Sequence, residues 1–372
     1  MTPKSLLVTG GAGFIGANFV HHWVEEYPQS RLVVFDALTY AGNITSLQSL
    51  LDEGRIEFVR GDILDEALVG QLLREHAVDA IVHFAAESHV DRSITGPDAF
   101  IETNVNGTHS LLKAARKLWI DSKAEGQRRF LHVSTDEVYG SLGIDDPAFS
   151  EATPYAPNSP YSASKAASDH LVRAYHHTYG LPVVTTNCSN NYGPFQYPEK
   201  LLPLMLINAL EGRDLPVYGD GANVRDWLFV EDHCRGIALA LTKGTDGECY
   251  NIGGNNEQRN LDLVHLLCAE IDKRFAATPA LAARFPNAPA ANGRPTTDLI
   301  RFVTDRPGHD RRYAIDARKI TRELGFEPRE TMATGLALTI DWYLEHEAWW
   351  RGIMDGSYHS WVDLNYGARA SA

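Results

Sequence analysis

Tyr161 and Lys165 have the residue types and the spacing that proton transfer requires. They stand four residues apart in a segment with helical periodicity, so their side chains share one helix face. A nearby ammonium lowers the pKa of a phenol, which would allow Tyr161 to remove a proton from a hydroxyl group. The same pair is commonplace on exposed helices, so its interpretation depends on the elements that position it.

Two neighbouring carboxyl groups, Asp136 and Glu137, follow a short apolar segment upstream of this pair. Adjacent carboxylates in a shared, partly dry site repel each other, so one stays protonated as an acid while the other serves as a base. Ser134, and equally Thr135, would hold the reacting oxygen at the end of the same segment. Oxidation of a simple alcohol needs neither acid, so the pair indicates a further proton-transfer step. The alternative interpretation is a polar loop in solvent.

A glycine-rich turn near the N-terminus predicts a dinucleotide site. Apolar residues 5–9 precede Gly10, Gly13 and Gly16, a pattern typical of strand, tight turn and helix. These glycines permit positive φ, close approach to a pyrophosphate and tight packing of helix on strand. Asp36 follows a second apolar segment, twenty residues after Gly16, where its carboxylate can accept hydrogen bonds from both hydroxyls of an adenosine ribose. This placement favours NAD over NADP, whose 2′-phosphate it would repel.

The strand-like pattern continues at residues 56–59, 80–84 and 129–133, with helical patterns between. Such alternation predicts a Rossmann-type, doubly wound α/β fold with a parallel sheet and right-handed crossovers. Ligands gather at the carboxyl ends of its strands, so Asp62, residues 85–88 and Ser134 should face one crevice. The positive nicotinamide ring of NAD⁺ in that crevice would lower the pKa of Tyr161 further.

Composition and charge exclude several classes of protein. The 34 Lys and Arg against 48 Asp and Glu give a net charge of −14, which argues against a nucleic-acid binder. With 44 % hydrophobic and 22 % charged residues, the chain is neither disordered nor a coiled coil. It lacks an apolar run of about 18 residues for a membrane span, and its four cysteines form no CxxC. We therefore expect a cytoplasmic protein with no membrane partner and no metal site.

Six motifs together resemble the extended short-chain dehydrogenase/reductases that modify nucleotide sugars, and within them the dTDP-glucose 4,6-dehydratase family. The likeness runs nearly end to end. The paired acids and the last motif are far more specific than the first and fourth motifs, which the whole superfamily shares. The motifs lie at Thr9–Gly16, Ala85–Ser93, Thr135–Gly140, Tyr161–Lys165, Asn190–Pro194 and Asp305–Arg312.

The resemblance implies an NAD-dependent lyase that converts dTDP-glucose to dTDP-4-keto-6-deoxyglucose. Tyr161 would take the C4 hydroxyl proton as hydride passes to NAD⁺, while Thr135 bonds the C4 oxygen and Lys165 holds the nicotinamide ribose. Glu137 would then abstract the C5 proton while Asp136 protonates the departing C6 hydroxyl. Return of the hydride to C6 and reprotonation of C5 would regenerate NAD⁺.

The resemblance also implies the binding residues. Arg225 is the leading contact for the diphosphate, because a guanidinium can bind its oxygens bidentately, and Tyr218 would stack on the base. Contacts to NAD are expected from Gly10, Gly13, Phe14, Ile15, Gly16, Asp36, Ala37, Leu38, Thr39, Asp62, Ile63, Phe84, Ala85, Ala86, Ser88, Thr103, Ser134, Tyr161, Lys165 and Asn191. Contacts to the nucleotide sugar are expected from Ser88, Thr135, Asn190, Lys200, Leu201, Pro216, Val217, Tyr218, Arg225, Asn260, Asp305, Arg306, Pro307, Gly308 and His309.

The regular alternation stops after Cys188, which predicts two domains. We expect an NAD-binding Rossmann domain over residues 1–190, to which 223–255 returns. A smaller α/β domain over 191–372 would bind the nucleotide sugar in the cleft between them. The Ala- and Pro-rich stretch 275–297 is expected to be a surface loop.

Two long helical patterns, at 104–118 and 161–179, correspond to helices that relatives pair across a dimer axis. The resemblance therefore implies a homodimer with a four-helix bundle at its interface.

Two other functions remain open from the sequence. A nucleotide-sugar 4-epimerase shares the fold, the NAD and the Tyr/Lys pair, but inversion at C4 needs no deprotonation at C5. Asp136 and Glu137 are the residues that distinguish the two reactions. A protein that binds NAD without turnover would be expected to lose its base, and here Tyr161 and Lys165 are both present.

Overall fold

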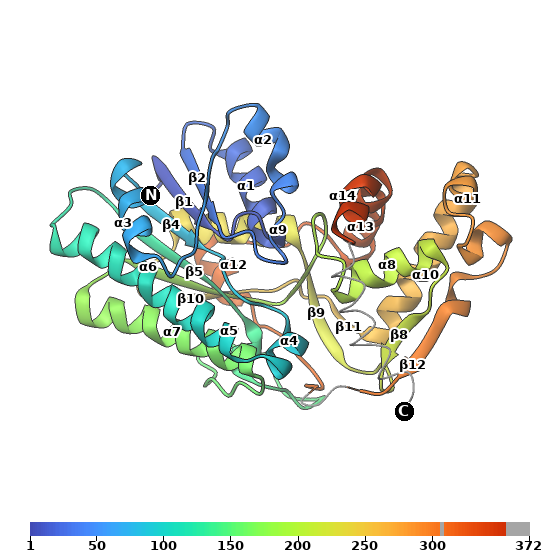
Figure 1. The fold of residues 1–372 in the computed structure, drawn as a ribbon. Coiled ribbons are helices and arrows are strands. Elements are labelled where there is room, and N and C mark those ends of the chain that lie inside the picture. Colours follow the sequence, from blue (N-terminus) through green and yellow to red (C-terminus); the bar gives the residue numbers. More distant parts are fainter. Residues whose placement is uncertain (306–308, 355–372) are drawn as a thin grey trace.

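Seven short apolar segments form one parallel sheet in the computed structural model (Figure 1), which describes residues 1–305 and 309–354. Every pair of neighbouring strands runs parallel, in the order β10-β6-β5-β4-β1-β2-β3. This confirms the doubly wound arrangement, with the order reversing beside β1 and β10 extending one edge. The strands are β1 (Ser5–Thr9), β2 (Arg31–Asp36), β3 (Glu57–Arg60), β4 (Ala80–His83), β5 (Arg129–Thr135), β6 (Val183–Cys188) and β10 (Cys249–Ile252).

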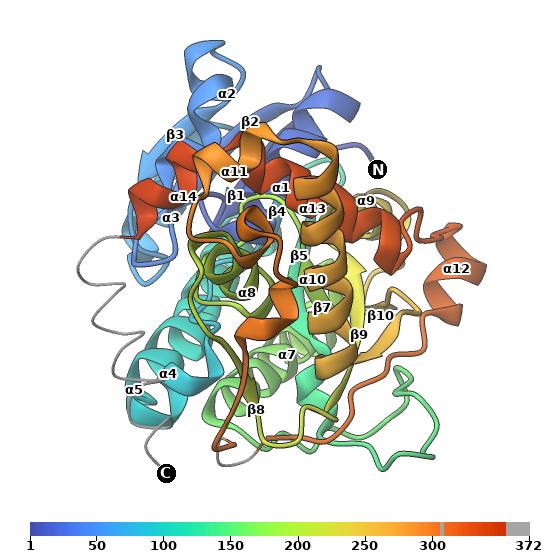
Figure 2. The ribbon, with the colours of Figure 1, turned by 90° about the vertical axis from the view of Figure 1, so that its right-hand side faces the viewer.

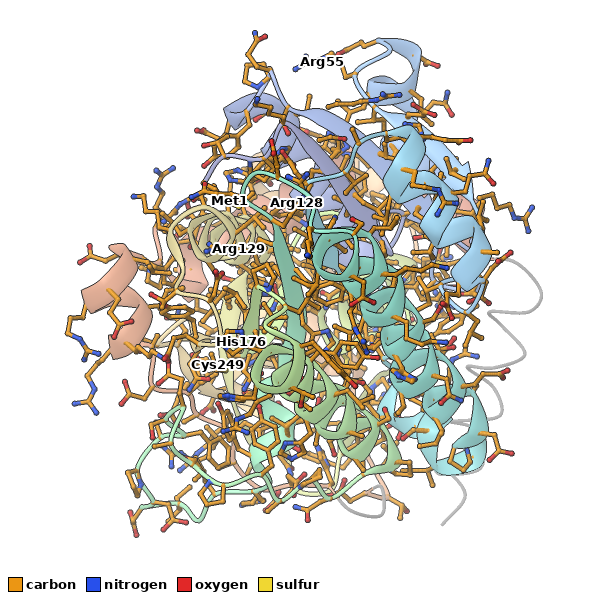
Figure 3. All side chains as sticks on the ribbon, turned by 90° about the vertical axis from the view of Figure 1, so that its left-hand side faces the viewer. Met1, Arg55, Arg128, Arg129, His176 and Cys249 are labelled. Atoms are coloured by element: carbon orange, nitrogen blue, oxygen red, sulfur yellow. The ribbon has the colours of Figure 1, made fainter. Side chains whose placement is uncertain are left out.

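Helices cover both faces of this sheet, because successive strand side chains point to opposite sides. Leu6 and Val8 belong to the core under α1 (Phe14–Glu26), α9 (Val230–Lys243) and α12 (Arg318–Leu324). Leu7, between them, belongs to the core on the other face, and Figure 3 shows the helices that cover this face. The helices there are α3 (Glu66–Glu75), α6 (Thr108–Ala115) and α7 (Pro160–Tyr179).

The helix expected at 161–179 is α7, and its first turn is fixed by local chemistry. The Ser159 hydroxyl accepts a hydrogen bond from the Ser162 amide, and the Ser162 hydroxyl accepts one from the Ser159 amide. Pro160 occupies the first helical position, where no amide is needed, and Gly180 ends the helix with φ +71°. This start places Tyr161 in the first turn and Lys165 one turn later.

The helix expected at 104–118 is longer than predicted. Two π-helical segments, η2 (Ile101–Gly107) and η3 (Arg116–Asp121), flank α6 and extend the helical run to residues 101–121. Shorter elements complete this part of the chain: η1 (Ile44–Leu47), α2 (Gln48–Asp52), α4 (Val90–Thr95), α5 (Asp98–Phe100) and η4 (Asp136–Tyr139).

A smaller lobe lies to one side of the large sheet (right in Figure 1, facing the viewer in Figure 2) and has its own apolar core. Its three-stranded sheet places β9 between parallel β7 and antiparallel β11, and β8 pairs with β12. From the segment 223–255, β9 joins this sheet, whereas α9 and β10 join the large one. The lobe contains β7 (Asn190–Tyr192), β8 (Leu215–Tyr218), β9 (Val224–Phe229), β11 (Glu257–Arg259), β12 (Ile300–Val303), α8 (Leu201–Glu211), α10 (Asn260–Ala277), α11 (Ala280–Arg284), η5 (Pro289–Asn292), η6 (Thr296–Leu299), α13 (Met332–Glu345) and α14 (Glu347–Ile353).

The expectation of a surface loop over 275–297 was wrong. The end of α10, the short helix α11 and the turn η5 occupy the stretch, and Leu281, Phe285 and Ala288 are buried in the core of the smaller lobe. We expected a loop because the stretch is rich in Ala and Pro and its apolar residues do not recur at a helical or strand spacing. The apolar residues between them pack inward nonetheless.

The four cysteines form no disulfide. In the described part of the chain, every helix falls short of the length and apolarity that a membrane crossing takes.

Candidate functional site

One large cavity lies where the strands of the large sheet end, as expected for a doubly wound fold. It is lined by all of the residues assigned to NAD from the sequence except Leu38: Gly10, Gly13, Phe14, Ile15, Gly16, Asp36, Ala37, Thr39, Asp62, Ile63, Phe84, Ala85, Ala86, Ser88, Thr103, Ser134, Tyr161, Lys165 and Asn191. Leu38 differs because its side chain packs against the core, while its backbone amide donates to Asp36.

The glycine turn is shaped by close backbone contacts. Gly10 has φ +70°, and a Cβ there would lie 2.5 Å from the Ala85 amide nitrogen. A Cβ on Gly16 would lie 2.2 Å from the Gly10 carbonyl oxygen. Gly13 instead faces the cavity and precedes α1 without a side-chain cap, which leaves the first helix amides to an anionic ligand. These features fit the pyrophosphate of a dinucleotide.

Asp36 ends β2 with its carboxylate fixed by two backbone amides. Ala12 donates to Oδ2 at 2.9 Å and Leu38 donates to Oδ1 at 2.8 Å. Burial raises the pKa of this carboxyl, and the two amide bonds oppose that effect. Each oxygen keeps a lone pair for a ribose hydroxyl, so the geometry fits NAD.

Thr135, Tyr161 and Lys165 meet at the end of β5 and the start of α7, and all three line the cavity. The side chains of Thr135 and Tyr161 share a hydrogen bond. Lys165 donates from Nζ to the Val133 carbonyl oxygen at 2.9 Å. The Ser134 hydroxyl is already engaged, because it donates to Asp169 Oδ2 at 2.9 Å. Thr135 is therefore the residue placed to hold a reacting oxygen.

The pKa of Tyr161 was expected to be lowered by Lys165, but its surroundings in the structure raise it. Burial raises the pKa of Tyr161 well above its usual value, and the negative charge of Glu137 raises it further, while the bond to Thr135 lowers it. Lys165 is itself buried, which lowers its own pKa. A cationic nicotinamide ring bound in the cavity would oppose the effects of burial and of Glu137 on Tyr161.

Asp136 and Glu137 line the same cavity, at the start of the turn η4. Asp136 is 1 % exposed, and its Oδ2 has no hydrogen-bond partner among the described residues. Burial raises the pKa of Asp136 well above its usual value, repulsion from Glu137 and Asp226 adds to this, and Arg225 opposes it. Burial and the neighbouring carboxylates thus favour the protonated form of Asp136, which is the form that an acid needs.

A buried polar network lies behind Lys165. Asp169, one helical turn after Lys165, accepts hydrogen bonds from Ser134 at 2.9 Å and from the Tyr155 hydroxyl at 3.0 Å, and its Oδ1 lies 3.0 Å from His132 Nε2. Burial raises the pKa of Asp169 to about 6, and Lys165 opposes the shift. Burial lowers the pKa of His132 well below its usual value, so this histidine is neutral.

Asp169 should make folding stability depend on pH. Its pKa is about 6 in the folded protein and about 4 in an unfolded chain. Between these values the folded state holds a proton that the unfolded state has lost, so the free energy of unfolding falls as pH rises. We expect Asp169→Asn to remove this fall. Relative to the parent, the cofactor-stripped variant should gain up to about 3 kcal/mol from pH 4 to pH 7 in denaturant titrations. A constant difference between the two proteins would contradict the assignment.

The residues assigned to the nucleotide sugar divide into two groups. Ser88, Thr135, Asn190 and Lys200 line the cavity. The others that the structure describes lie outside its lining, at Leu201, Pro216, Val217, Tyr218, Arg225, Asn260, Asp305 and His309. Arg306, Pro307 and Gly308 lie outside the described residues.

Part of this second group is nevertheless close together. His309 Nδ1 lies 2.6 Å from Asp305 Oδ1, and the rings of Tyr218 and His309 meet edge to face at 6.0 Å. Arg225 is buried, with its guanidinium 4.3 Å from the centre of the Tyr313 ring. Arg225 also acts on the pKa of Asp136, which connects this group to the cavity.

The polar residues of the cavity that were not predicted from the sequence include Tyr40, Glu87, Gln196, Tyr197 and Glu199. Each stands beside or inside a motif that was recognised. Tyr40 lies in the loop after Asp36, and Glu87 lies within Ala85–Ser93. The other three follow Asn190–Pro194. Proximity to those motifs was the available signal.

Comparison with known proteins agrees with this geometry. Residues 7–339 match the family model described as GDP-mannose 4,6 dehydratase. A dTDP-glucose 4,6-dehydratase from Xanthomonas campestris pv. campestris is 58 % identical over 354 residues, which cover 95 % of this chain and 96 % of the relative.

Solved structures agree as well. A dTDP-glucose 4,6-dehydratase from Streptomyces venezuelae, with NAD and TYD bound, is 49 % identical with a TM-score of 0.82, covering 94 % of this chain and 99 % of that one. A UDP-glucose 4-epimerase from Thermotoga maritima is more distant, at 26 % identity and a TM-score of 0.76, covering 92 % of this chain and 99 % of that one.

Proposed function

Because the chain belongs to the dTDP-glucose 4,6-dehydratase family, we propose how its own residues carry out that reaction. The protein is an NAD-dependent hydro-lyase that converts dTDP-glucose to dTDP-4-keto-6-deoxyglucose. Bound NAD accepts a hydride from C4 of the sugar and returns it to C6. The observation that carries this assignment is the buried acid Asp136 beside Glu137, in the cavity that also holds Tyr161.

Tyr161 is the base for oxidation at C4. Its hydroxyl shares a hydrogen bond with Thr135, so the two side chains can hold the C4 oxygen between them. Tyr161 takes the C4 hydroxyl proton as the carbonyl forms. Lys165, fixed by the Val133 carbonyl at 2.9 Å, places its positive charge beneath the site and holds the nicotinamide ribose.

Glu137 and Asp136 carry out the elimination. The C4 carbonyl acidifies the C5 proton, which Glu137 removes. Asp136, kept protonated by burial and by its neighbour, gives its proton to the departing C6 hydroxyl, and water leaves. As the hydride returns to C6, Glu137 gives its proton back to C5. The proton that Tyr161 took from the C4 hydroxyl is released and one proton restores Asp136, so the cycle closes.

The nucleotide lies toward the smaller lobe. We assign Arg225 to the diphosphate, because it is a buried guanidinium between Asp136 and the lobe. Tyr218, Asp305 and His309, which cluster beside β8, form the base and ribose end of the site. We propose that the NAD-binding domain comprises residues 1–190 with α9 and β10 from the segment 223–255, and that β9 belongs with the nucleotide-sugar domain.

We propose that the protein is a cytoplasmic homodimer that pairs α7 and the α6 region across a two-fold axis. Ile101 and Tyr179, at the ends of these two helical runs, are exposed apolar side chains of the kind that an interface covers. A monomeric mass in sedimentation would contradict the dimer. Recovery from a membrane or secreted fraction would contradict the location.

Mass spectrometry of dTDP-glucose, incubated with purified protein and no added cofactor, tests the activity. Loss of one water from the sugar is the expected result. An unchanged mass, with dTDP-galactose separated by chromatography, would indicate the epimerase instead. No product after NAD is added would contradict both.

A further inference from the structure

Glu199 is a buried carboxylate at the rim of the NAD cavity. Its side chain is 1 % exposed and lines the cavity. Arg92 donates to Oε2 from Nη2 at 3.0 Å and from Nε at 3.3 Å, and His89 Nε2 lies 3.9 Å from Oε1. A carboxylate removed from water in this way is stabilised chiefly by the guanidinium that contacts it.

Tyr40 completes the cluster from a third segment. The Arg92 guanidinium lies 4.0 Å from the centre of the Tyr40 ring, and burial and the negative charge of Glu199 raise the pKa of the Tyr40 hydroxyl. The ring also meets Tyr197 edge to face at 5.8 Å. Tyr40 is therefore held by a cation–π contact and an aromatic contact, with its hydroxyl close to the Glu199 charge.

The three segments joined at this point each contribute residues to the lining of the cavity, namely Tyr40, Ser88 and Glu199. Tyr40 belongs to the loop after Asp36, which faces the adenosine ribose. Arg92 lies on α4, directly after the motif that follows β4. Glu199 precedes Lys200, whose Nζ donates to the Ser88 carbonyl oxygen at 3.2 Å. This second hydrogen bond joins the same two walls of the cavity, the segment of Glu199 and the motif that follows β4. Separation of these walls would require the buried Glu199 charge to lose its partner.

We propose that Tyr40, Arg92 and Glu199 form a latch that retains NAD between turnovers. The inference rests on the proposed function, in which the hydride taken from C4 must return to C6 of the same sugar. The cycle does not require release of the cofactor. Contacts that close the cavity can therefore slow the loss of NAD without lowering the turnover rate. The three residues position the walls around the cofactor and take no proton in the reaction.

The rate at which bound NAD leaves the protein tests the latch. Glu199→Gln keeps the shape of the side chain but removes its charge, and Tyr40→Phe removes the hydroxyl on which Glu199 acts. After rapid gel filtration, chromatography of the released nucleotide should show NAD loss about 10- to 100-fold faster for Glu199→Gln, with a smaller increase for Tyr40→Phe. Added NAD should restore kcat, with a raised apparent KM for NAD.

Asp246→Asn is the matched control. Arg129 donates to Asp246 Oδ1 from Nε at 3.2 Å and from Nη2 at 2.9 Å, a two-nitrogen contact like that of Arg92 with Glu199, but at the opposite end of β5 from the cavity. NAD loss from this variant should match the parent. Thermal unfolding of each cofactor-free variant separates a loosened latch from a loosened fold.

Retention of NAD at the parent rate by both Glu199→Gln and Tyr40→Phe would overturn the latch. So would a fall in kcat that added NAD does not restore, because Glu199 would then act on the sugar. These measurements do not depend on turnover of dTDP-glucose. A protein that is inactive on that substrate, but loses NAD faster when Glu199 is changed, would support the latch while contradicting the proposed function.

Discussion

Glu137→Gln should stop dehydration after the sugar has been oxidised. A carboxamide of the same size cannot accept the C5 proton, so the rate of water loss should fall by about 10²–10⁴-fold. Exchange of the C5 hydrogen for solvent deuterium should disappear. Oxidation at C4 relies on Tyr161, so mixing the variant with dTDP-glucose should leave the cofactor reduced, which absorbance records directly. The variant would thus be trapped halfway through the reaction.

The same substitution should change Asp136. Repulsion from Glu137 is the second cause of the raised pKa of Asp136, after burial, so its removal should bring that pKa down.

Glu66→Gln serves as the control, since Glu66 lies on α3 in a half-exposed ion pair with Lys113. C5 exchange at the parent rate in Glu137→Gln would exclude Glu137 as the base.

The fold could be predicted closely because its signals are local. Each strand of the large sheet that was expected is present within a residue or two, since buried parallel strands leave continuous apolar runs ended by Gly, Asp or Ser. The stretch 275–297 failed for the opposite reason. Leu281, Phe285 and Ala288 are buried in a core that also contains residues as distant in the sequence as Tyr192 and Trp350. Short helical turns carry no clear period of their own.

The site could be predicted where one motif carries the chemistry. Gly10, Asp36 and Tyr161 each stand at a fixed distance from the end of a strand or the start of a helix, and all three line the cavity. Glu199 could not be found in that way. Its importance comes from contacts with Arg92 and Tyr40, over a hundred residues away, and only the folded chain brings them together.

The direction in which the pKa of Tyr161 is shifted could not be predicted from the sequence, for a related reason. Spacing places Lys165 on the same face of α7, but it does not show that the ammonium is held by the Val133 carbonyl, or that Glu137 acts on the phenol more strongly. Burial is a property of the whole assembly, and here burial has the largest effect.

Tyr161→Phe should stop the reaction one stage earlier than Glu137→Gln. Without the hydroxyl, no group takes the C4 proton, so oxidation should slow by about 10²–10⁴-fold and no reduced cofactor should form on mixing with dTDP-glucose. Because burial raises the pKa of Tyr161, the parent rate should rise with pH as the phenol ionises, and the variant should lack this rise.

Tyr27→Phe is the control for this variant, because Tyr27 follows α1 outside the cavity lining, with its ring stacked on that of Trp23 at 4.1 Å. NAD content and thermal unfolding should match among the parent and both variants, since the Tyr161 ring itself remains. Formation of reduced cofactor by Tyr161→Phe at the parent rate would assign the C4 proton to another group. If instead neither Tyr161→Phe nor Glu137→Gln dehydrates the sugar, but only Glu137→Gln reduces the cofactor, oxidation and elimination are separate steps run by separate residues of one cavity.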